Sequence, residues 1–377
     1  MKVLGIETSC DDTAFAVLDG RTKVLASVVS SQTALHRAYG GVVPELASRH
    51  HLENIEPILE KTLADAGVSL AQIDGFAVTA GPGLIGSLLV GVSFAKALAW
   101  SMGKPLAAVN HLEGHVRAAY LESPDLPYPA LALIVSGGHS SLYACPEEGV
   151  YRPLARTRDD AAGEAFDKAA RLLGLGYPGG PVIDRLAKEG DPAAVPFPRA
   201  RMSDGSLDFS FSGLKTALLR YAKEAGLAVD RGAPSAAYDP HGPERGPVEE
   251  GEKETSQRVR DVAASFQRAV VDVLVDRTLT AAERGPEPVR SVIVSGGVAC
   301  NSLLREEIRS RCGERGLAVA IPSPAYCTDN AAMIAAAGLL HLERGERAPL
   351  DLTAIPGWRL GEPEAAYRRD RVTLPGA

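Results

Sequence analysis

Short apolar runs separated by polar, glycine-rich turns recur along the chain, and longer segments with apolar residues at helical spacing lie between them. The first twenty residues hold two such runs around a polar turn, which predicts a β-hairpin. Further strands are predicted at 73–79, 105–109, 130–135, 141–145 and 291–294, and helices at 43–66, 88–100, 111–120, 258–283 and 331–341. This alternation of strands and helices predicts an α/β protein.

The second half of the chain repeats the opening pattern of the first half. Residues 130–145 again form a strand, a polar glycine turn and a strand, and this weak self-similarity favours a duplicated, two-lobed fold. We expect an N-terminal lobe at 1–125, a C-terminal lobe at 126–345 and a tail at 346–377. Within the second lobe, residues 226–256 are dominated by Pro, Gly, Ala and charge, which predicts a flexible surface insertion.

The composition narrows the class of protein. The 377 residues are 45% hydrophobic, with no signal peptide pattern and no apolar run of about 20 residues that would predict a membrane helix. The five cysteines are scattered and form no C-x-x-C pair, which predicts reduced thiols and a cytoplasmic protein. A net charge of -7 gives no general attraction for nucleic acid, so RNA binding would need a local basic patch or a partner.

A pair of histidines is the first candidate for chemistry. His111 and His115 lie four residues apart, so on a helix both imidazoles share one face and can bind one metal ion. The spacing is that of the zinc-peptidase signature H-E-x-x-H, but the acid here is Glu113, turned by about 100° from the position of a peptidase base. The alternative is two surface histidines on an ordinary helix.

A carboxylate late in the chain is a candidate third ligand. Asp329 lies at the start of the predicted helix at 331–341, within a loop of small residues, where it is placed to complete a two-histidine metal site. The competing interpretation is that Thr328 or Asp329 is only the N-cap of that helix.

Three glycine turns follow predicted strands. They lie at 81–86, 136–138 and 295–297, and such turns leave backbone N–H groups available to a phosphate or ribose. Together they favour a nucleotide-like ligand, although the first suits tight helix packing equally well. Basic residues interleaved with aromatic ones at 196–223 suit RNA, or else a solvated helix with its core aromatics.

An ordered set of motifs carries a resemblance over nearly the whole chain. The motifs are E-T-S-C-D-D-T at 7–13, G-G-V-V-P-E at 40–45, G-P-G-L at 81–84, N-H-L-E-G-H at 110–115, V-S-G-G-H at 135–139, G-E-A-F-D-K at 163–168, Y-P-G-G at 177–180, F-S-F-S-G-L-K at 209–215, S-G-G-V-A-x-N at 295–301 and T-D-N at 328–330. In this order they resemble the TsaD (Gcp) family of bacterial tRNA N6-adenosine threonylcarbamoyltransferases. The insertion at 226–256 is longer than is usual for that family.

The resemblance implies an α/β, two-lobed fold of the actin, sugar-kinase and heat-shock-ATPase (ASKHA) class with duplicated domains. It also implies transfer of a threonylcarbamoyl group from threonylcarbamoyl-AMP to the exocyclic amine of the adenosine beside the tRNA anticodon, with release of AMP. The resemblance further implies two protein partners, a shorter TsaB-like paralogue and a TsaE-like ATPase, and no association with a membrane.

The resemblance also assigns the site residues. His111, His115 and Asp329 would bind one metal ion, iron with zinc as the alternative. Asp11 would lie near the reacting groups, where a carboxylate can accept the proton of the attacking amine. The residues assigned to the adenylate are Ile134, Val135, Ser136, Gly137, Gly138, Asp167, Gly180, Asp184 and Asn301.

Three other functions compete with this interpretation. A metallopeptidase is disfavoured by the misplaced Glu113 and by the nucleotide-like turns, and a kinase of the same fold would have no use for the two-histidine helix. A catalytically silent scaffold paralogue should lack the two histidines and the late aspartate, and this chain has all three.

Overall fold

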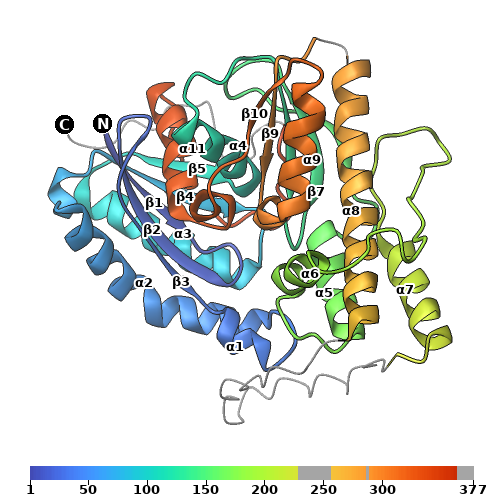
Figure 1. Cartoon of the computed structure of the whole chain (residues 1–377). Helices are drawn as coiled ribbons and strands as arrows, with labels where there is room; N and C mark the ends of the chain where they lie inside the picture. The colour runs from blue at the N-terminus through green and yellow to red at the C-terminus, as the bar shows by residue number, and fades with distance from the viewer. Residues whose placement is uncertain (228–255, 286–287, 363–377) are drawn as a thin grey trace. The chain divides into compact units, whose positions relative to one another are not determined.

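The computed structural model describes residues 1–227, 256–285 and 288–362, and these residues form two compact units (Figure 1). Unit 1 consists of Met1–Gln32, Pro44–Pro124 and Asp329–Ala377, and unit 2 consists of Thr33–Val43 and Asp125–Thr328. Most of the predicted insertion, residues 228–255, lies outside the described residues. The lobe boundaries at 125 and 345 stay predictions, and the chain returns to unit 1 after residue 328.

Unit 1 contains a five-stranded sheet in the order β3-β2-β1-β4-β5. The hairpin strands pair antiparallel, whereas β1 pairs with β4 and β4 with β5 in parallel. Its elements are β1 (Lys2–Glu7), β2 (Asp12–Asp19), β3 (Lys23–Ser31), α2 (Pro44–Ala66), η1 (Leu70–Gln72), β4 (Gly75–Gly81), α3 (Ile85–Met102), β5 (Leu106–Asn110), α4 (His111–Glu122) and α11 (Ala331–Glu343).

Unit 2 contains a second sheet, in the order β10-β9-β6-β7-β8, with the same arrangement of antiparallel and parallel pairs. Its elements are α1 (Thr33–Arg37), β6 (Ala130–Val135), β7 (Ser140–Cys145), β8 (Arg152–Arg156), α5 (Ala162–Leu172), α6 (Gly179–Ala187), α7 (Ser212–Glu224), α8 (Gln257–Arg284), β9 (Ser291–Ser295), η2 (Gly297–Cys300), α9 (Ser302–Gly313), β10 (Ala318–Ala320) and α10 (Pro324–Cys327). Two sheets of matching strand order confirm the predicted duplicated α/β fold.

The two faces of the unit 1 sheet are covered differently because side chains alternate along each strand. Leu4 and Ile6 of β1 face the hydrophobic cluster formed with α2 and α3. On the opposite face α11 packs against β1 and β4, and α4 packs against α11 (Figure 1). The approach is close: a Cβ on Gly5 would lie 2.1 Å from the backbone oxygen of Ala331. The small residues of α11 therefore let it lie directly on the sheet.

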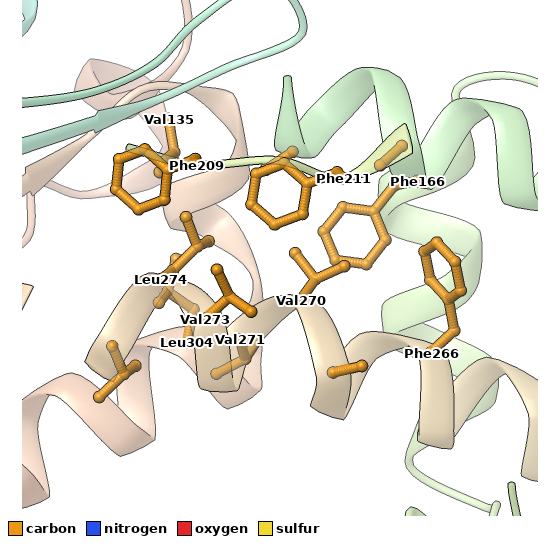
Figure 2. Close-up of a cluster of buried hydrophobic side chains, with 14 of the residues drawn as sticks. Val135, Phe166, Phe209, Phe211, Phe266, Val270, Val271, Val273, Leu274 and Leu304 are labelled. Carbon is orange, nitrogen blue, oxygen red and sulfur yellow. The ribbon is translucent and has the colours of Figure 1, made fainter. Parts of the chain in front are cut away.

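The core of unit 2 is built around α8, which the helical spacing at 258–283 predicted. Figure 2 shows phenylalanine rings from the segment before α7 and from α5 facing the apolar side of α8. Phe209 and Phe211 stack with their centroids 6.3 Å apart, and Phe166 meets Phe266 edge-to-face at 6.1 Å. Phe197, Phe209 and Phe211 of the basic 196–223 stretch are thus core residues, as the solvated-helix alternative expected of its aromatics, but all three precede helix α7 rather than lying on it.

One helix among the described residues, α3, is long and apolar enough to cross a membrane, and 33% of its 18 residues are buried inside the protein. Its inner face contributes Val92, Ala95 and Ala99 to the core of unit 1. A single helix of this kind is also typical of a core helix in a globular domain.

Candidate active site

The carboxyl ends of three neighbouring strands bring together the polar residues of unit 1. In the sheet β1, β4 and β5 are parallel neighbours, so their carboxyl ends meet at one edge. Glu7 ends β1, Thr79 lies near the end of β4, and His111 begins α4 directly after β5. Asn110 is the N-cap of α4 and accepts a hydrogen bond from the backbone N–H of Leu112 at 3.0 Å. The cap holds the histidine helix in place at this edge.

Three predicted ligands form one cluster in unit 1. The ligand atoms of His111, His115 and Asp329 all lie within 4.8 Å of one another. The Oδ1 atom of Asp329 is 3.4 Å from Nε2 of His111 and 3.3 Å from Nε2 of His115. Tetrahedral ligands at the usual metal distances are about 3.3 Å apart, which is longer than most hydrogen bonds. The spacing therefore fits three ligands of one cation.

The surroundings of the two rings also fit a cation. His115 is completely buried, and neither of its ring nitrogens has a hydrogen-bond partner among the described residues. The two rings meet edge-to-face with centroids 4.8 Å apart. The Nε2 atoms of both rings face the same carboxylate oxygen of Asp329. A buried imidazole nitrogen without a partner is costly, and a bound metal ion would satisfy it.

The electrostatics of the cluster are dominated by its acids. Burial lowers the pKa of His111, but the carboxylates of Asp329 and Glu7 outweigh burial and raise that pKa well above its ordinary value. For His115 burial prevails and the pKa is lowered. Burial raises the pKa of Asp329, but the two histidines lower it by a larger amount, so the net pKa is well below its usual value. Asp329 is therefore an ionised carboxylate, the form that a metal ligand requires.

The prediction that Thr328 or Asp329 caps the last helix is wrong. The N-cap of α11 is Asn330, whose side chain accepts a hydrogen bond from the backbone N–H of Met333 at 3.0 Å. Asn is as good a cap as Asp, and one residue of difference leaves the Asp329 carboxylate outside the helix. Capping therefore does not compete for Asp329.

Glu113 has a structural partner. Its Oε2 lies 2.9 Å from Nε2 of His341 on α11, and it belongs to no group that could hold a metal among the described residues. This agrees with the prediction that its place on the helix is wrong for a peptidase base.

Three further polar groups lie at or beside the start of β2: Asp11 in the loop before it, Asp12 as its first residue, and His51 on α2. Asp11 is half-buried, and its backbone oxygen accepts a hydrogen bond from the N–H of Gln32 at 3.1 Å. Asp12 is half-buried as well; burial, followed by the charge of Asp329, raises its pKa to about 7. His51 of α2 contacts the Thr13 hydroxyl and the backbone oxygen of Cys10 at 2.7 and 2.9 Å. His51 was not singled out from the sequence, because only the fold reveals its neighbours.

The glycine turn after β4 is a packing turn. The N–H of Gly83 donates to the backbone oxygen of Pro356 at 3.2 Å, and the N–H of Leu84 donates to that of Ser9 at 2.8 Å. A Cβ on Gly83 would lie 2.4 Å from the Ser9 oxygen. Close packing, rather than anion binding, is the role that these donors serve.

The other two glycine turns lie side by side in unit 2. They follow β6 and β9, which are parallel neighbours with Ile134 opposite Ser295. Gly296 has φ +97°, and a Cβ there would lie 2.3 Å from the backbone oxygen of Val135. By contrast, a Cβ on Gly137 or Gly138 would meet no described atom within 4 Å. The turns pack tightly against each other and leave open space beside Gly137 and Gly138.

The remaining residues predicted for the adenylate surround these turns. Asp167 of α5 accepts a hydrogen bond from the N–H of Gly179 at 2.7 Å, and its pKa is raised, chiefly by burial. Asp184 of α6 accepts from the N–H and hydroxyl of Ser302, at 3.0 and 2.7 Å. Asn301 caps α9 and donates to Gln267 at 3.1 Å. These contacts, and the packing of η2 on α5 and β6, gather the predicted residues in one region of unit 2.

The fold and the clusters define a class: an α/β protein of the actin, sugar-kinase and heat-shock-ATPase type with a candidate two-histidine, one-carboxylate metal centre. The sequence model described as "TsaD: tRNA N6-adenosine threonylcarbamoyltransferase" matches residues 23–336. The chain therefore belongs to the TsaD family.

Relatives over nearly the full length carry the same name. The proteins named tRNA N6-adenosine threonylcarbamoyltransferase from Symbiobacterium thermophilum and Moorella thermoacetica are 52% and 50% identical to this chain. The first alignment covers 95% of this chain and 97% of the relative, and the second covers 94% and 96%. Among solved structures, full-length HypF in a phosphate- and nucleotide-bound form has a TM-score of 0.54 at 13% identity, covering 91% of this chain and 55% of HypF. That likeness concerns the fold alone.

Proposed function

We propose that this protein transfers the threonylcarbamoyl group from threonylcarbamoyl-AMP to the exocyclic amine of the adenosine beside the anticodon of tRNA, releasing AMP. The observation that carries the proposal is the convergence of His111, His115 and Asp329 in a chain of the TsaD family. A metallopeptidase is not favoured, because Glu113 is paired with His341 and the family model is that of a transferase.

In this proposal His111, His115 and Asp329 hold one metal ion. Two histidines and one carboxylate with open positions are typical of non-haem iron, so the ion is iron, with zinc as the alternative. When bound, such an ion supplies Lewis-acid stabilisation of negative charge on a substrate oxygen. The buried ring nitrogens of His115, which have no hydrogen-bond partner among the described residues, support the presence of an ion.

The adenylate is assigned to unit 2. Backbone N–H groups of Gly137 and Gly138 would contact its phosphate, and the open space beside these two residues leaves room for that approach. Ser136 is assigned to the same site, although its own N–H donates to the backbone oxygen of His139 at 2.8 Å. The turn follows Ile134 and Val135, whose strand sets its position. The other residues assigned to the adenylate are Asp167, Gly180, Asp184 and Asn301.

Asp11 is assigned to proton transfer. An aromatic exocyclic amine is a poor nucleophile, and the proton that it loses on attack needs an acceptor. Asp11 lies half-buried in the loop that follows β1. His111, His115 and Asp329 belong to the same unit.

A chain with a net charge of -7 does not attract tRNA by itself, so we expect partner proteins to help it bind this substrate. We assign a TsaB-like paralogue and a TsaE-like ATPase as partners in the cytoplasm. An exposed apolar face on unit 1 supports the paralogue: Ile85, Leu89 and Trp100 of α3 are 53%, 42% and 73% exposed, and Leu52 of the adjoining α2 is 65% exposed. The three α3 residues share one side of the helix. Exposed apolar patches of this kind mark protein interfaces.

Loss of pairing tests that surface. A Leu89→Glu chain should no longer form a complex with the paralogue on size-exclusion chromatography, because a charge would be buried in the interface. Leu350→Glu, at a residue 48% exposed that lies on neither α2 nor α3, should still pair. Pairing of both variants would remove the surface from the proposal.

The function itself is tested by coupled product analysis. Purified protein, metal, threonylcarbamoyl-AMP, unmodified tRNA and both partners should yield AMP and modified adenosine in equal amounts. His111→Ala should abolish both products, while His50→Ala, at a partly exposed histidine of α2, should retain them. No modified adenosine from the wild type under these conditions would overturn the proposal.

A further inference from the structure

A buried glutamate, Glu7, contacts one of the two candidate ligand histidines, His111. Glu7 is 1% exposed and lies on the sheet face that α11 covers, two residues after Gly5. One carboxylate oxygen, Oε2, is 2.9 Å from Nδ1 of His111 and accepts a hydrogen bond from the Thr79 hydroxyl at 2.7 Å. The other, Oε1, accepts from the N–H of Ser9 at 2.5 Å. Both oxygens of this buried acid are thus satisfied by hydrogen bonds.

These contacts decide which nitrogen of His111 carries a proton toward Glu7. Two donors, the Thr79 hydroxyl and the backbone N–H of Ser9, already point at the carboxylate oxygens of Glu7, which is the environment of an ionised carboxylate. An ionised carboxylate can only accept hydrogen bonds, so Nδ1 of His111 is the donor. The opposite nitrogen, Nε2, is the one that faces Asp329 at 3.4 Å.

We propose that Glu7 is a positioning residue of the metal centre. It holds His111 in the tautomer and ring orientation that present Nε2 to the cation, and it raises the basicity of that ligand. Its charge also adds to that of Asp329, so that two carboxylates balance one divalent ion in a buried site. This inference rests on the metal-binding part of the proposed function.

The second histidine has no such support. Nδ1 of His115 has no hydrogen-bond partner among the described residues, whereas Nδ1 of His111 contacts both Glu7 and, at 3.2 Å, the Ser9 hydroxyl. The anchoring is therefore one-sided. Loss of Glu7 should act through His111 alone and leave the placement of His115 on α4 unchanged.

The chain offers a matched control on the metal helix itself. Glu113 is also a buried carboxylate bonded to a histidine, but its partner is His341, which is not a candidate ligand. Glu113→Gln and Glu7→Gln each remove one buried negative charge with little change of shape. Only Glu7→Gln removes the charge beside Nδ1 of a candidate metal ligand, His111.

The test measures zinc binding to the purified chain by competition with a chromogenic chelator. The Glu7→Gln variant should bind zinc about 10–100-fold more weakly than the wild type, the usual effect of losing such a partner. Glu113→Gln should bind close to wild type. Equal affinity of wild type and Glu7→Gln would overturn the role of Glu7, whereas no zinc binding by the wild type would overturn the metal centre itself.

A second measurement needs no variant. In zinc-loaded wild-type protein with ¹⁵N-labelled histidine, long-range ¹H–¹⁵N spectra should show His111 protonated at Nδ1 and metal-bound at Nε2. Metal bound at Nδ1, or a proton on Nε2, would contradict the proposal even where Glu7→Gln fails to fold.

Discussion

The Nε2 atom of His341 lies 2.9 Å from the carboxylate of Glu113, and this buried pair joins the helix of the two candidate ligands to α11, which begins two residues after Asp329. Nδ1 of the same ring contacts Glu346 at 2.5 Å. Burial by itself lowers the pKa of His341, but the two carboxylates outweigh it and raise the pKa to about 10. Glu113 therefore stabilises the packing of α4, which carries His111 and His115, against α11, which follows Asp329.

Stability should consequently depend on pH in the alkaline range. The folded pKa of His341 lies above the unfolded value of about 6.5, so the contribution is complete below pH 6.5 and is lost as the pH rises through about 10. Between these values the wild type should lose up to about 1.4 kcal/mol per pH unit relative to His341→Gln, measured by urea unfolding. Glu343→Gln, which breaks an exposed pair with Arg21, should cost less than about 1 kcal/mol. A constant difference between wild type and His341→Gln across this range would contradict the prediction.

A second pH dependence is expected on the acid side. Burial lowers the pKa of His51, although its hydrogen bond to the Cys10 oxygen raises it. Below about pH 6.5 the unfolded chain therefore binds the extra proton first, and stability falls as the pH decreases toward the lowered folded pKa. His51→Gln should flatten this part of the curve of unfolding free energy against pH. An acid limb as steep in the variant as in the wild type would assign the dependence to other groups.

The two glycines after β9 should respond differently to alanine. Gly296→Ala places a Cβ on a residue with φ +97° and 2.3 Å from the Val135 oxygen. The substitution should therefore lower the free energy of unfolding by about 1 kcal/mol or more, which is the usual cost of strain at such a site. A Cβ on Gly297 meets no described atom within 4 Å, and Gly297→Ala should keep the stability of the wild type. Chemical denaturation of both variants decides the matter. Titration with threonylcarbamoyl-AMP then asks whether the added methyl at 297 weakens binding.

The cap of α11 should be worth a measurable amount. Asn330→Ala removes the acceptor for the Met333 N–H and should cost about 1 kcal/mol, while Asn330→Asp should keep most of the stability. Thr328→Ala, at the residue that the sequence offered as an alternative cap, should change stability by less than about 0.5 kcal/mol. If Thr328→Ala proved the more damaging of the two alanine variants, the cap assignment would be wrong.

The order of elements was predictable because local patterns determine it. The strand at 130–135 was located to the residue, and helix α8 differs from its predicted range of 258–283 by one residue at each end. The strand predicted at 73–79 begins and ends two residues later, because the boundary depends on pairing with β1 and β5. Glycine turns were recognisable as turns, but not by function: the donors after β4 are used in packing, while the turns after β6 and β9 lie together beside open space.

The sequence by itself determined the α/β class, the repeated strand pattern, the two-histidine helix and the family motifs, since each depends on residues close together in the chain. Only the tertiary structure decided which groups meet. Glu7 and His111 are 104 residues apart, and Glu113 and His341 are 228 apart, yet each pair is in hydrogen-bond contact. Glu7 and His111 meet because parallel strands bring their carboxyl ends to one edge, and Glu113 and His341 meet because α11 packs against α4. No local period encodes such pairings, because they depend on how separate elements pack in space.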